Sequence, residues 1–397
     1  MRVLVLLPCQ PFPAYNGQTH RLAHVTRSLA ERHEVWLGAL IEPHQTLAFP
    51  DDLRPLFREL CLQPMAAPDR GGLSKWRRRL AGEPHDVARF RSTAMAAFVA
   101  RVIRDHDPDV IVVGDPALDQ YLPRQGRRRV VVMDYVCETI LQIERMRDLS
   151  VAPEKWLWEG RRRKYLRFLR GIGDHYDVVL LNSAEDRTSL ARYWPEDRLH
   201  HVANGLNLTD YPIGLAPVVA DRLIYPGSVL YPPNRDAVEW FAGRILPRIQ
   251  AVRPGVEFRV TGAHDADAPQ APGLVYTGRV PDVRAEIAAA WACVVPLRLG
   301  AGGARFKVIE SLALGTPIVG TAIGIEGLTL TDGENYLAAE GEAALAEACL
   351  RVLTDPDLRA RLSAQGRAKM ERDYAWERLF ARIEALIEDR QAAREAA

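Results

Sequence analysis

The residues best suited to chemistry lie in one short segment, Gly300–Glu310, which reads GAGGARFKVIE. We expect a glycine-rich loop and then a helix, because glycines let the backbone approach a ligand and a helix start presents free N–H groups. Arg305 and Lys307 would add full positive charge there, and Glu310 would accept hydrogen bonds from hydroxyl groups. This combination suits a ligand that joins phosphates to a sugar, as a nucleotide sugar does. The alternative interpretation is an ordinary loop before a surface helix with solvated charges.

Length and composition favour a globular protein of two domains. The chain has 397 residues, of which 48% are hydrophobic and 26% charged. A formal net charge of +1 gives no general attraction for nucleic acid, and we predict no nucleic-acid partner. The five cysteines are scattered and form no CxxC pair, which argues against disulfides or structural zinc and suits a cytoplasmic protein. No cluster of residues with the spacing of metal ligands is visible either, and we predict neither a metal site nor a cofactor.

No apolar run reaches the length of about 18 residues that a membrane helix needs. The apolar start, residues 1–13, is too brief for a signal peptide and predicts a first β-strand.

Short apolar strands alternate with amphipathic helices along most of the sequence, which predicts parallel sheets buried on both faces. The predicted strands are Val3–Leu7, Glu34–Leu40, Val110–Val113, Val130–Met133 and Val178–Leu181, and then Arg222–Tyr225, Glu257–Thr261, Leu274–Tyr276, Cys293–Leu297 and Pro317–Gly320. Two such sets predict an α/β protein with two doubly wound domains facing across a cleft, where ligands bind at the carboxyl ends of the strands.

The boundary between the domains should follow Asn204-Gly205, in the turn segment HVANGLN, which we interpret as a hinge. Residues 1–205 would form the first domain and residues 206–376 the second. After a bend at Tyr374–Trp376, a last helix in 377–397 would cross back to the first domain.

Several loops after predicted strands are candidates for ligand contact. Asn16-Gly17 precedes a helix expected from about Gln18, and its N–H groups would face a phosphate. Gly227 and Ser228 follow a strand directly and would offer backbone N–H groups and a hydroxyl. Asn234 is interpreted as the cap of a helix over Asp236–Leu246.

Other loop residues leave two interpretations open. Thr321 and Glu326, in the segment GTAIGIEG, either border the ligand or belong to a glycine turn. Asp115 and Asp134 stand just past strand ends, with Glu138 close by, and are either catalytic groups or helix-capping side chains. His20 lies close behind Gly17, and a lone histidine at such a position is more often packed or solvated than catalytic.

Two basic stretches, Lys75–Arg79 and Glu154–Arg170, interleave tryptophan, tyrosine and phenylalanine with arginine. Together they suit either peripheral contact with an anionic bilayer or the binding of an acidic acceptor. The second stretch suits equally a core helix whose outer face carries solvated arginines.

These segments together resemble the family-four retaining glycosyltransferases, which have the GT-B fold. HVANGLN is similar to the family's hinge, and YPGSVLYPPNRDAVEWFAGRILPRI to its strand–glycine–helix segment. VYTGRVPDVR and PLRLGAGGARFKVIESLALGTPIVGTAIGIEGL are similar to its last donor-side strands and helix. The resemblance implies a metal-independent, retaining transfer of sugar from a nucleotide-diphosphate sugar to a saccharide or lipid-linked acceptor, in surface polysaccharide or glycolipid synthesis.

By this resemblance Glu310 holds the donor ribose, the first domain binds the acceptor and the second the donor. The implied donor-binding residues are Gly17, Gly227, Ser228, Gly302, Gly303, Arg305, Phe306, Lys307 and Glu310, and the implied or guessed catalytic residues are Arg305, Lys307, Asp115 and Asp134.

The sequence departs from the family pattern at three places. Gly302 occupies the position of a first glutamate, Pro232 to Asn234 replace an Arg and Lys, and Gly114-Asp115 replaces a histidine. These departures leave two rival classes: a GT-B-fold nucleotide-sugar epimerase, and a non-catalytic partner protein that kept the fold.

Overall fold

A computed structural model describes residues 1–14, 16–42, 45, 48–65, 84–123, 129–136, 138–300 and 305–396. These residues fall into two compact units. Unit 1 contains residues 1–202 together with 380–396, and unit 2 contains residues 203–300 and 305–379. The long first segment of unit 1 ends three residues before the predicted boundary at 205.

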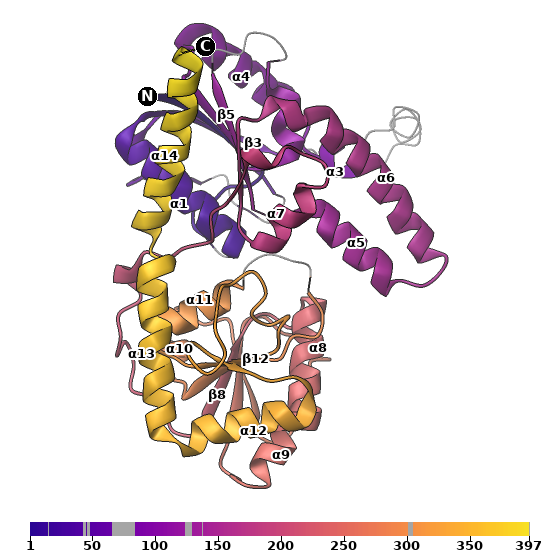
Figure 1. The fold of residues 1–397 in the computed structure, drawn as a ribbon, viewed down its shortest axis with the longest axis vertical. Helices are drawn as coiled ribbons and strands as arrows, with labels where there is room; N and C mark the ends of the chain where they lie inside the picture. The colour runs from indigo at the N-terminus through magenta and orange to yellow at the C-terminus, as the bar shows by residue number, and fades with distance from the viewer. Residues whose placement is uncertain are drawn as a thin grey trace. The chain divides into compact units, whose positions relative to one another are not determined.

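Unit 1 is built on a seven-stranded, entirely parallel sheet of order β3-β2-β1-β4-β5-β6-β7. The strands are β1 Arg2–Leu7, β2 Glu34–Ile41, β3 Phe57–Pro64, β4 Val110–Val113, β5 Val130–Tyr135, β6 Val178–Leu181 and β7 Leu199–His201. Almost every residue of the central strands is buried, because helices cover both faces (Figure 1). The strand order reverses between β1 and β4, which is where open α/β sheets bind ligands.

The helices of unit 1 follow the strands in alternation. They are α1 Gly17–Arg32, α3 His85–Ala88, α4 Thr93–His106, α5 Thr139–Leu149, α6 Glu154–Ile172 and α7 Ala184–Leu190, with short 3-10 turns η1 Arg54–Leu56, η2 Pro116–Tyr121, η3 Gly173–His175 and η4 Glu196–Arg198. Helix α1 begins at Gly17, where the side chain of Asn16 accepts from the backbone N–H of Thr19 and Thr19 reciprocates. Helices α5 and α6 lie side by side as a helical hairpin (Figure 1).

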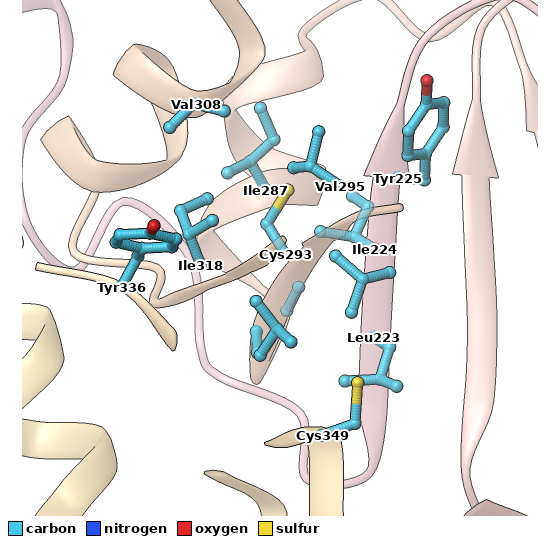
Figure 2. Close-up of a cluster of buried hydrophobic side chains, with 14 of the residues drawn as sticks. Leu223, Ile224, Tyr225, Ile287, Cys293, Val295, Val308, Ile318, Tyr336 and Cys349 are labelled. Carbon is cyan, nitrogen blue, oxygen red and sulfur yellow. The ribbon is translucent and has the colours of Figure 1, made fainter. Parts of the chain in front are cut away.

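Unit 2 is built on a six-stranded parallel sheet of order β10-β9-β8-β11-β12-β13. The strands are β8 Arg222–Pro226, β9 Glu257–Thr261, β10 Leu274–Gly278, β11 Ala292–Val295, β12 Ile318–Gly320 and β13 Leu337–Ala338. Figure 2 shows side chains of β8, β11 and β12, among them Ile224, Cys293 and Ile318, gathered with Val308 and Cys349 from covering helices. Here the strand order reverses between β8 and β11.

The helices of unit 2 are α8 Pro232–Trp240, the π-helical turn η6 Phe241–Ile245, α9 Leu246–Gln250, α10 Val283–Ala288, α11 Phe306–Ala313, α12 Gly341–Thr354, α13 Pro356–Asp373 and the start of α14 Trp376–Glu395, after the 3-10 turn η5 Leu208–Asp210. Helix α8 begins four residues before the predicted Asp236, because two prolines suit a first turn. The prediction that Asn234 caps this helix is wrong, since Asn234 lies inside the first turn and its side chain contacts the neighbouring strand.

All ten predicted strands are present, and the α/β class with two doubly wound sheets is confirmed. The prediction missed β3, β7 and β13. Strand β3 is a half-buried edge strand that carries Arg58, Glu59 and Gln63, so it lacks a continuous apolar run. The other two have only three and two residues, too few for a recognisable pattern. Within the described residues, no helix is both long and apolar enough to cross a bilayer.

Candidate functional site

The strongest cluster of functional groups lies in unit 2, where the carboxyl end of β8 meets the start of α11. Gly227 and Ser228 follow β8 directly, and Lys307 and Glu310 lie in the first turns of α11. Residues three apart share one face of a helix, so the cation and the carboxylate point to the same side. The reversal of strand order between β8 and β11 opens the sheet at this same position.

Two glycines leave room at the end of β8 for groups from other elements. Gly227 has φ +154°, and a Cβ there would stand 2.9 Å from both the Lys307 Nζ and the Asn234 Nδ2. Gly262, after β9, has φ +102°, and its Cβ would stand 2.8 Å from the backbone nitrogen of Ser228. Glycine at both positions therefore brings the backbone of two strand ends and the Lys307 ammonium group close together.

Lys307 is largely buried against neutral groups. Its Nζ donates to Asn234 Oδ1 at 3.3 Å and lies 3.7 Å from the centre of the Tyr225 ring. The Tyr225 hydroxyl donates to the same Asn234 oxygen at 2.6 Å, and Asn234 Nδ2 donates to the Ser228 carbonyl. Burial lowers the pKa of Lys307 to about 7, and the charge of Arg305 acts in the same direction. An anionic ligand would return the proton to this amine.

Glu310 is buried beside a tyrosine that comes from the start of unit 2. Its exposed fraction is 9%, and the Tyr211 hydroxyl donates to Glu310 Oε1 at 3.1 Å. Burial raises the pKa of Glu310 to about 7, while the hydrogen bond from Tyr211 opposes this rise. Arg367 donates to the carbonyl oxygen of Tyr211 at 2.6 Å and so holds the tyrosine in place. Sequence reasoning missed Tyr211, which lies 99 residues from its partner.

Arg305 stands at the N-cap of α11, directly before Phe306. Its guanidinium donates to the Ile323 carbonyl at 3.3 Å and lies 3.4 Å from Glu326. Arg305 is thus directed at the loop after β12 in this structure. Thr321 in that loop is buried and donates to the Leu297 carbonyl, so its hydroxyl joins two strand ends.

The glycines Gly302 and Gly303, predicted to bind the donor, lie outside the described residues.

Unit 1 has its own cavity at the corresponding edge of its sheet. The cavity has a volume of about 320 Å³ and lies where the strand order reverses between β1 and β4. Its lining residues are Pro8, Cys9, Asn16, Gln18, Glu42, Arg89, Phe90, Asp115, Thr139, Gln142, Arg161 and Tyr165. Most are polar or charged, which suits a ligand rich in hydroxyl groups. Asp115 lines this cavity and also caps η2, its Oδ1 accepting from the Ala117 N–H at 2.7 Å.

Asp134 and Glu138 are buried inside unit 1. Asp134 has no exposed surface, and its Oδ1 accepts from Arg21 Nε at 2.6 Å. Arg21 also donates to the Val202 carbonyl, so this pair joins α1, β5 and the end of the first segment. Glu138 caps α5 by accepting from two backbone N–H groups, and burial raises its pKa to about 7. These contacts favour structural roles for both carboxylates, and a catalytic role for Asp134 stays a prediction.

Gly17 and His20 lie in the first turns of α1. Asn16 and Gln18, on either side of Gly17, line the unit 1 cavity. His20 is half-buried, and burial lowers its pKa to about 4, so its ring is neutral at pH 7.

Comparisons with known proteins agree with this fold. Residues 220–355 match the model of the family described as glycosyl transferases group 1. The chain is 24% identical over 409 residues to the GDP-mannose-dependent alpha-(1-6)-phosphatidylinositol monomannoside mannosyltransferase of Mycolicibacterium smegmatis, over 91% of this chain and 95% of that protein.

Two solved structures illustrate the likeness of fold. The sucrose-phosphate synthase of Thermosynechococcus elongatus has a TM-score of 0.71 at 17% identity, over 99% of this chain and 100% of that one. The Anabaena protein HepE, solved in complex with UDP, has a TM-score of 0.65 at 13% identity, over 98% and 100% of the two chains. The chain is therefore a glycosyltransferase with the GT-B fold, and its residues 220–355 match the family described as glycosyl transferases group 1.

Proposed function

We propose that the protein transfers a sugar from a nucleoside-diphosphate sugar to a hydroxyl group of an acceptor, with retention of the anomeric configuration. The observation that carries this proposal is the placement of Lys307 and Glu310 on one face of α11, beside the glycine-lined end of β8. A cation next to a helix N-terminus, whose first N–H groups have no partner within the helix, suits a diphosphate. A carboxylate one turn along the helix suits ribose hydroxyls.

The donor would lie at the carboxyl edge of the unit 2 sheet. Its diphosphate would contact Lys307, the backbone after β8 and the N-terminus of α11, while Glu310 accepts hydrogen bonds from the ribose. Tyr211 would keep the Glu310 carboxylate oriented toward those hydroxyls. Arg305, at the start of the same helix, would turn toward the diphosphate from its contacts with the loop after β12.

The reaction breaks the bond between the anomeric carbon and the diphosphate oxygen, and forms a bond from that carbon to the acceptor oxygen on the same face. The acceptor's proton passes to the departing phosphate oxygen, so no protein base is required. Negative charge grows on the diphosphate as it leaves, and preorganised donors at such a position are worth about 3–4 kcal/mol each. We propose that Lys307, Arg305 and the loop N–H groups fill this role without a metal ion.

The acceptor would bind to unit 1, in the polar cavity that Asp115 lines. We propose a saccharide or lipid-linked acceptor and a role in surface polysaccharide or glycolipid synthesis, at the cytoplasmic face of the membrane. The mannosyltransferase relative, named for a phosphatidylinositol mannoside, supports a glycolipid.

The test is a transfer assay with two donors, GDP-mannose and UDP-glucose. The first is the donor in the name of the mannosyltransferase relative, and the second carries the UDP that is bound in the HepE structure. The purified protein, with EDTA present, is given each donor and a crude lipid extract, and the anomer of the product is read by NMR. A glycolipid with the donor's anomeric configuration is the expected result. Epimerised donor without transfer would favour the epimerase, and the absence of both transfer and donor hydrolysis would favour the non-catalytic protein.

A further inference from the structure

The tip of the α5–α6 hairpin is apolar and exposed. Five large apolar side chains of unit 1 are strongly exposed among the described residues, and all five lie within residues 146–157. They are Met146, Leu149, Val151, Trp156 and Leu157, here called the hairpin tip, with exposed fractions of 40%, 61%, 78%, 72% and 74%. Soluble proteins rarely gather exposed apolar side chains in this way unless the surface binds something.

The rest of the hairpin is strongly basic. Residues 139–172 contain nine arginines and lysines but four acidic residues, a net charge of +5 in a chain whose total is +1. Trp156, Arg163 and Arg167 are all exposed, and their spacing of seven and four residues places them on one face of α6. A positive face thus begins at the apolar tip and continues along the helix.

Ion pairs between the two helices make the hairpin a defined element. Arg162 Nε lies 2.8 Å from Glu144, and Arg147 Nη1 lies 3.2 Å from Glu159. Farther along α6, Tyr165 and Leu169 are buried in the core of unit 1, where the Tyr165 hydroxyl lies 3.2 Å from that of Tyr135. The hairpin is thus anchored in unit 1 by other side chains, and the tip residues remain exposed.

We propose that the hairpin tip docks on an anionic lipid bilayer. Its apolar side chains would enter the boundary between headgroups and acyl chains, where tryptophan is favoured, and the basic face of α6 would contact anionic headgroups. The excess of positive charge around an apolar end fits a lipid surface better than a second copy, because two such hairpins would repel each other.

Docking at the tip would bring lipid headgroups close to the unit 1 cavity. Thr139, Gln142, Arg161 and Tyr165 come from the same hairpin and line that cavity. At a rise of about 1.5 Å per residue, the five residues from Arg161 to Trp156 span roughly 8 Å along the helix. That a lipid-linked acceptor enters the cavity from the bilayer rests on the proposed function, whereas docking itself does not.

The experiment is co-sedimentation of the full chain with vesicles. One set contains phosphatidylcholine and phosphatidylglycerol in equal amounts, and the other contains phosphatidylcholine alone. Wild-type protein should bind the anionic vesicles at least about tenfold more tightly, and binding should weaken as salt shortens the Debye length from about 10 Å at 0.1 M to 3 Å at 1 M.

Two matched variants test whether vesicle binding depends on the hairpin tip or on exposed apolar side chains in general. Replacing Trp156 and Leu157 by serine should weaken binding on the order of a hundredfold, because burying a large apolar side chain changes an equilibrium about tenfold or more. Val218 and Val252, exposed in unit 2, serve as the control pair, and their replacement by serine should leave binding unchanged. All four residues are exposed, so thermal melting should show both variants folded.

Three outcomes would overturn the proposal: equal binding to both kinds of vesicle, equal loss of binding in both variants, or binding to neither kind of vesicle. Concentration-dependent self-association that the Trp156 and Leu157 substitutions abolish, without vesicle binding, would assign the tip to a second copy instead. Nucleotide-sugar binding, measured on the same samples, tests the proposed function separately, because the donor residues lie in unit 2.

Discussion

Lys307 and Glu310 show how burial acts on two opposite charges. Burial lowers the pKa of the lysine and raises that of the glutamate, and both reach about 7. This site is therefore less charged at neutral pH than the sequence suggests. The sequence identified both residues, because their spacing in a glycine-led helix is visible. It could not identify Tyr211 or Asn234, whose contacts exist only after distant segments fold together.

Affinity for a nucleotide sugar should be greatest near pH 7. Above pH 7 Lys307 loses its proton and binding the diphosphate must restore it, so affinity should fall by up to tenfold per pH unit. Below pH 7 Glu310 takes up a proton and becomes a poorer acceptor for ribose hydroxyls. Calorimetric titration with GDP-mannose or UDP-glucose between pH 6 and about 9 measures the fall in affinity on both sides of pH 7.

Single substitutions show which residue causes the fall in affinity on each side of pH 7. Glu310→Gln should remove the fall at acid pH while keeping the alkaline one, and Lys307→Met should do the reverse. An affinity that is the same across the range in the wild-type protein would contradict both pKa shifts.

Lys307→Met should also stabilise the protein without ligand. The pKa of Lys307 is lowered in the folded state, so its charge costs folding free energy below pH 7, and this cost fades as pH rises toward 10.5. Replacing a buried charge by an apolar side chain of similar size is worth about 1–3 kcal/mol. Melting curves at pH 6 should show the variant melting higher and losing its ligand-induced shift. A lower melting temperature at pH 6 would show that the Tyr225 and Asn234 contacts outweigh the desolvation of the charge.

At the scale of elements, the sequence predicts buried strands well and edges poorly. Continuous apolar runs such as Val110–Val113 identify central strands, whereas β3 at the sheet edge alternates with charged residues. Helix starts are harder to predict. Asn234 resembles a helix cap in the sequence, but its side chain accepts a hydrogen bond from Tyr225 on β8 and the helix begins two residues earlier. Packing between elements decides where edge strands and helix starts lie, and a local sequence pattern does not contain this information.

The end of β8 gives a prediction at this scale. Gly227→Ala should cost about 1–3 kcal/mol, because φ of +154° is strained for alanine and the new methyl group would displace Lys307 and Asn234. Nucleotide-sugar affinity should fall with it. Gly243→Ala is the matched control, since no atom lies within 4 Å of its added Cβ in the exposed helical segment, and it should be neutral or stabilising by about 0.5–1 kcal/mol. Urea unfolding measures both, and equal effects would contradict the steric argument.

At the scale of the whole molecule, the last helix belongs to two units. Residues 376–379 of α14 are assigned to unit 2 and its remainder to unit 1. Phe380, Ile383 and Ile387 are almost fully buried, at a helical spacing that was readable from the sequence. The order of the strands and the cavity of unit 1 were not readable, because both depend on which strands pair.

Unit 1 should depend on the end of the chain for its stability. Ile387→Ala should cost about 2–5 kcal/mol, since it removes a buried side chain from the contact between α14 and unit 1. Glu388→Ala, at the exposed neighbouring position, should stay within about 0.5 kcal/mol. Calorimetric melting distinguishes them. Equal melting of the two variants would show that α14 contributes little to unit 1.

The most direct test of the account is a crystal structure of the protein with GDP or UDP. We predict the diphosphate against the Lys307 ammonium group and the backbone after Gly227, with the ribose hydroxyls hydrogen-bonded to Glu310. A nucleotide bound elsewhere, with the end of β8 and the start of α11 unoccupied, would contradict the donor site and the mechanism built on it.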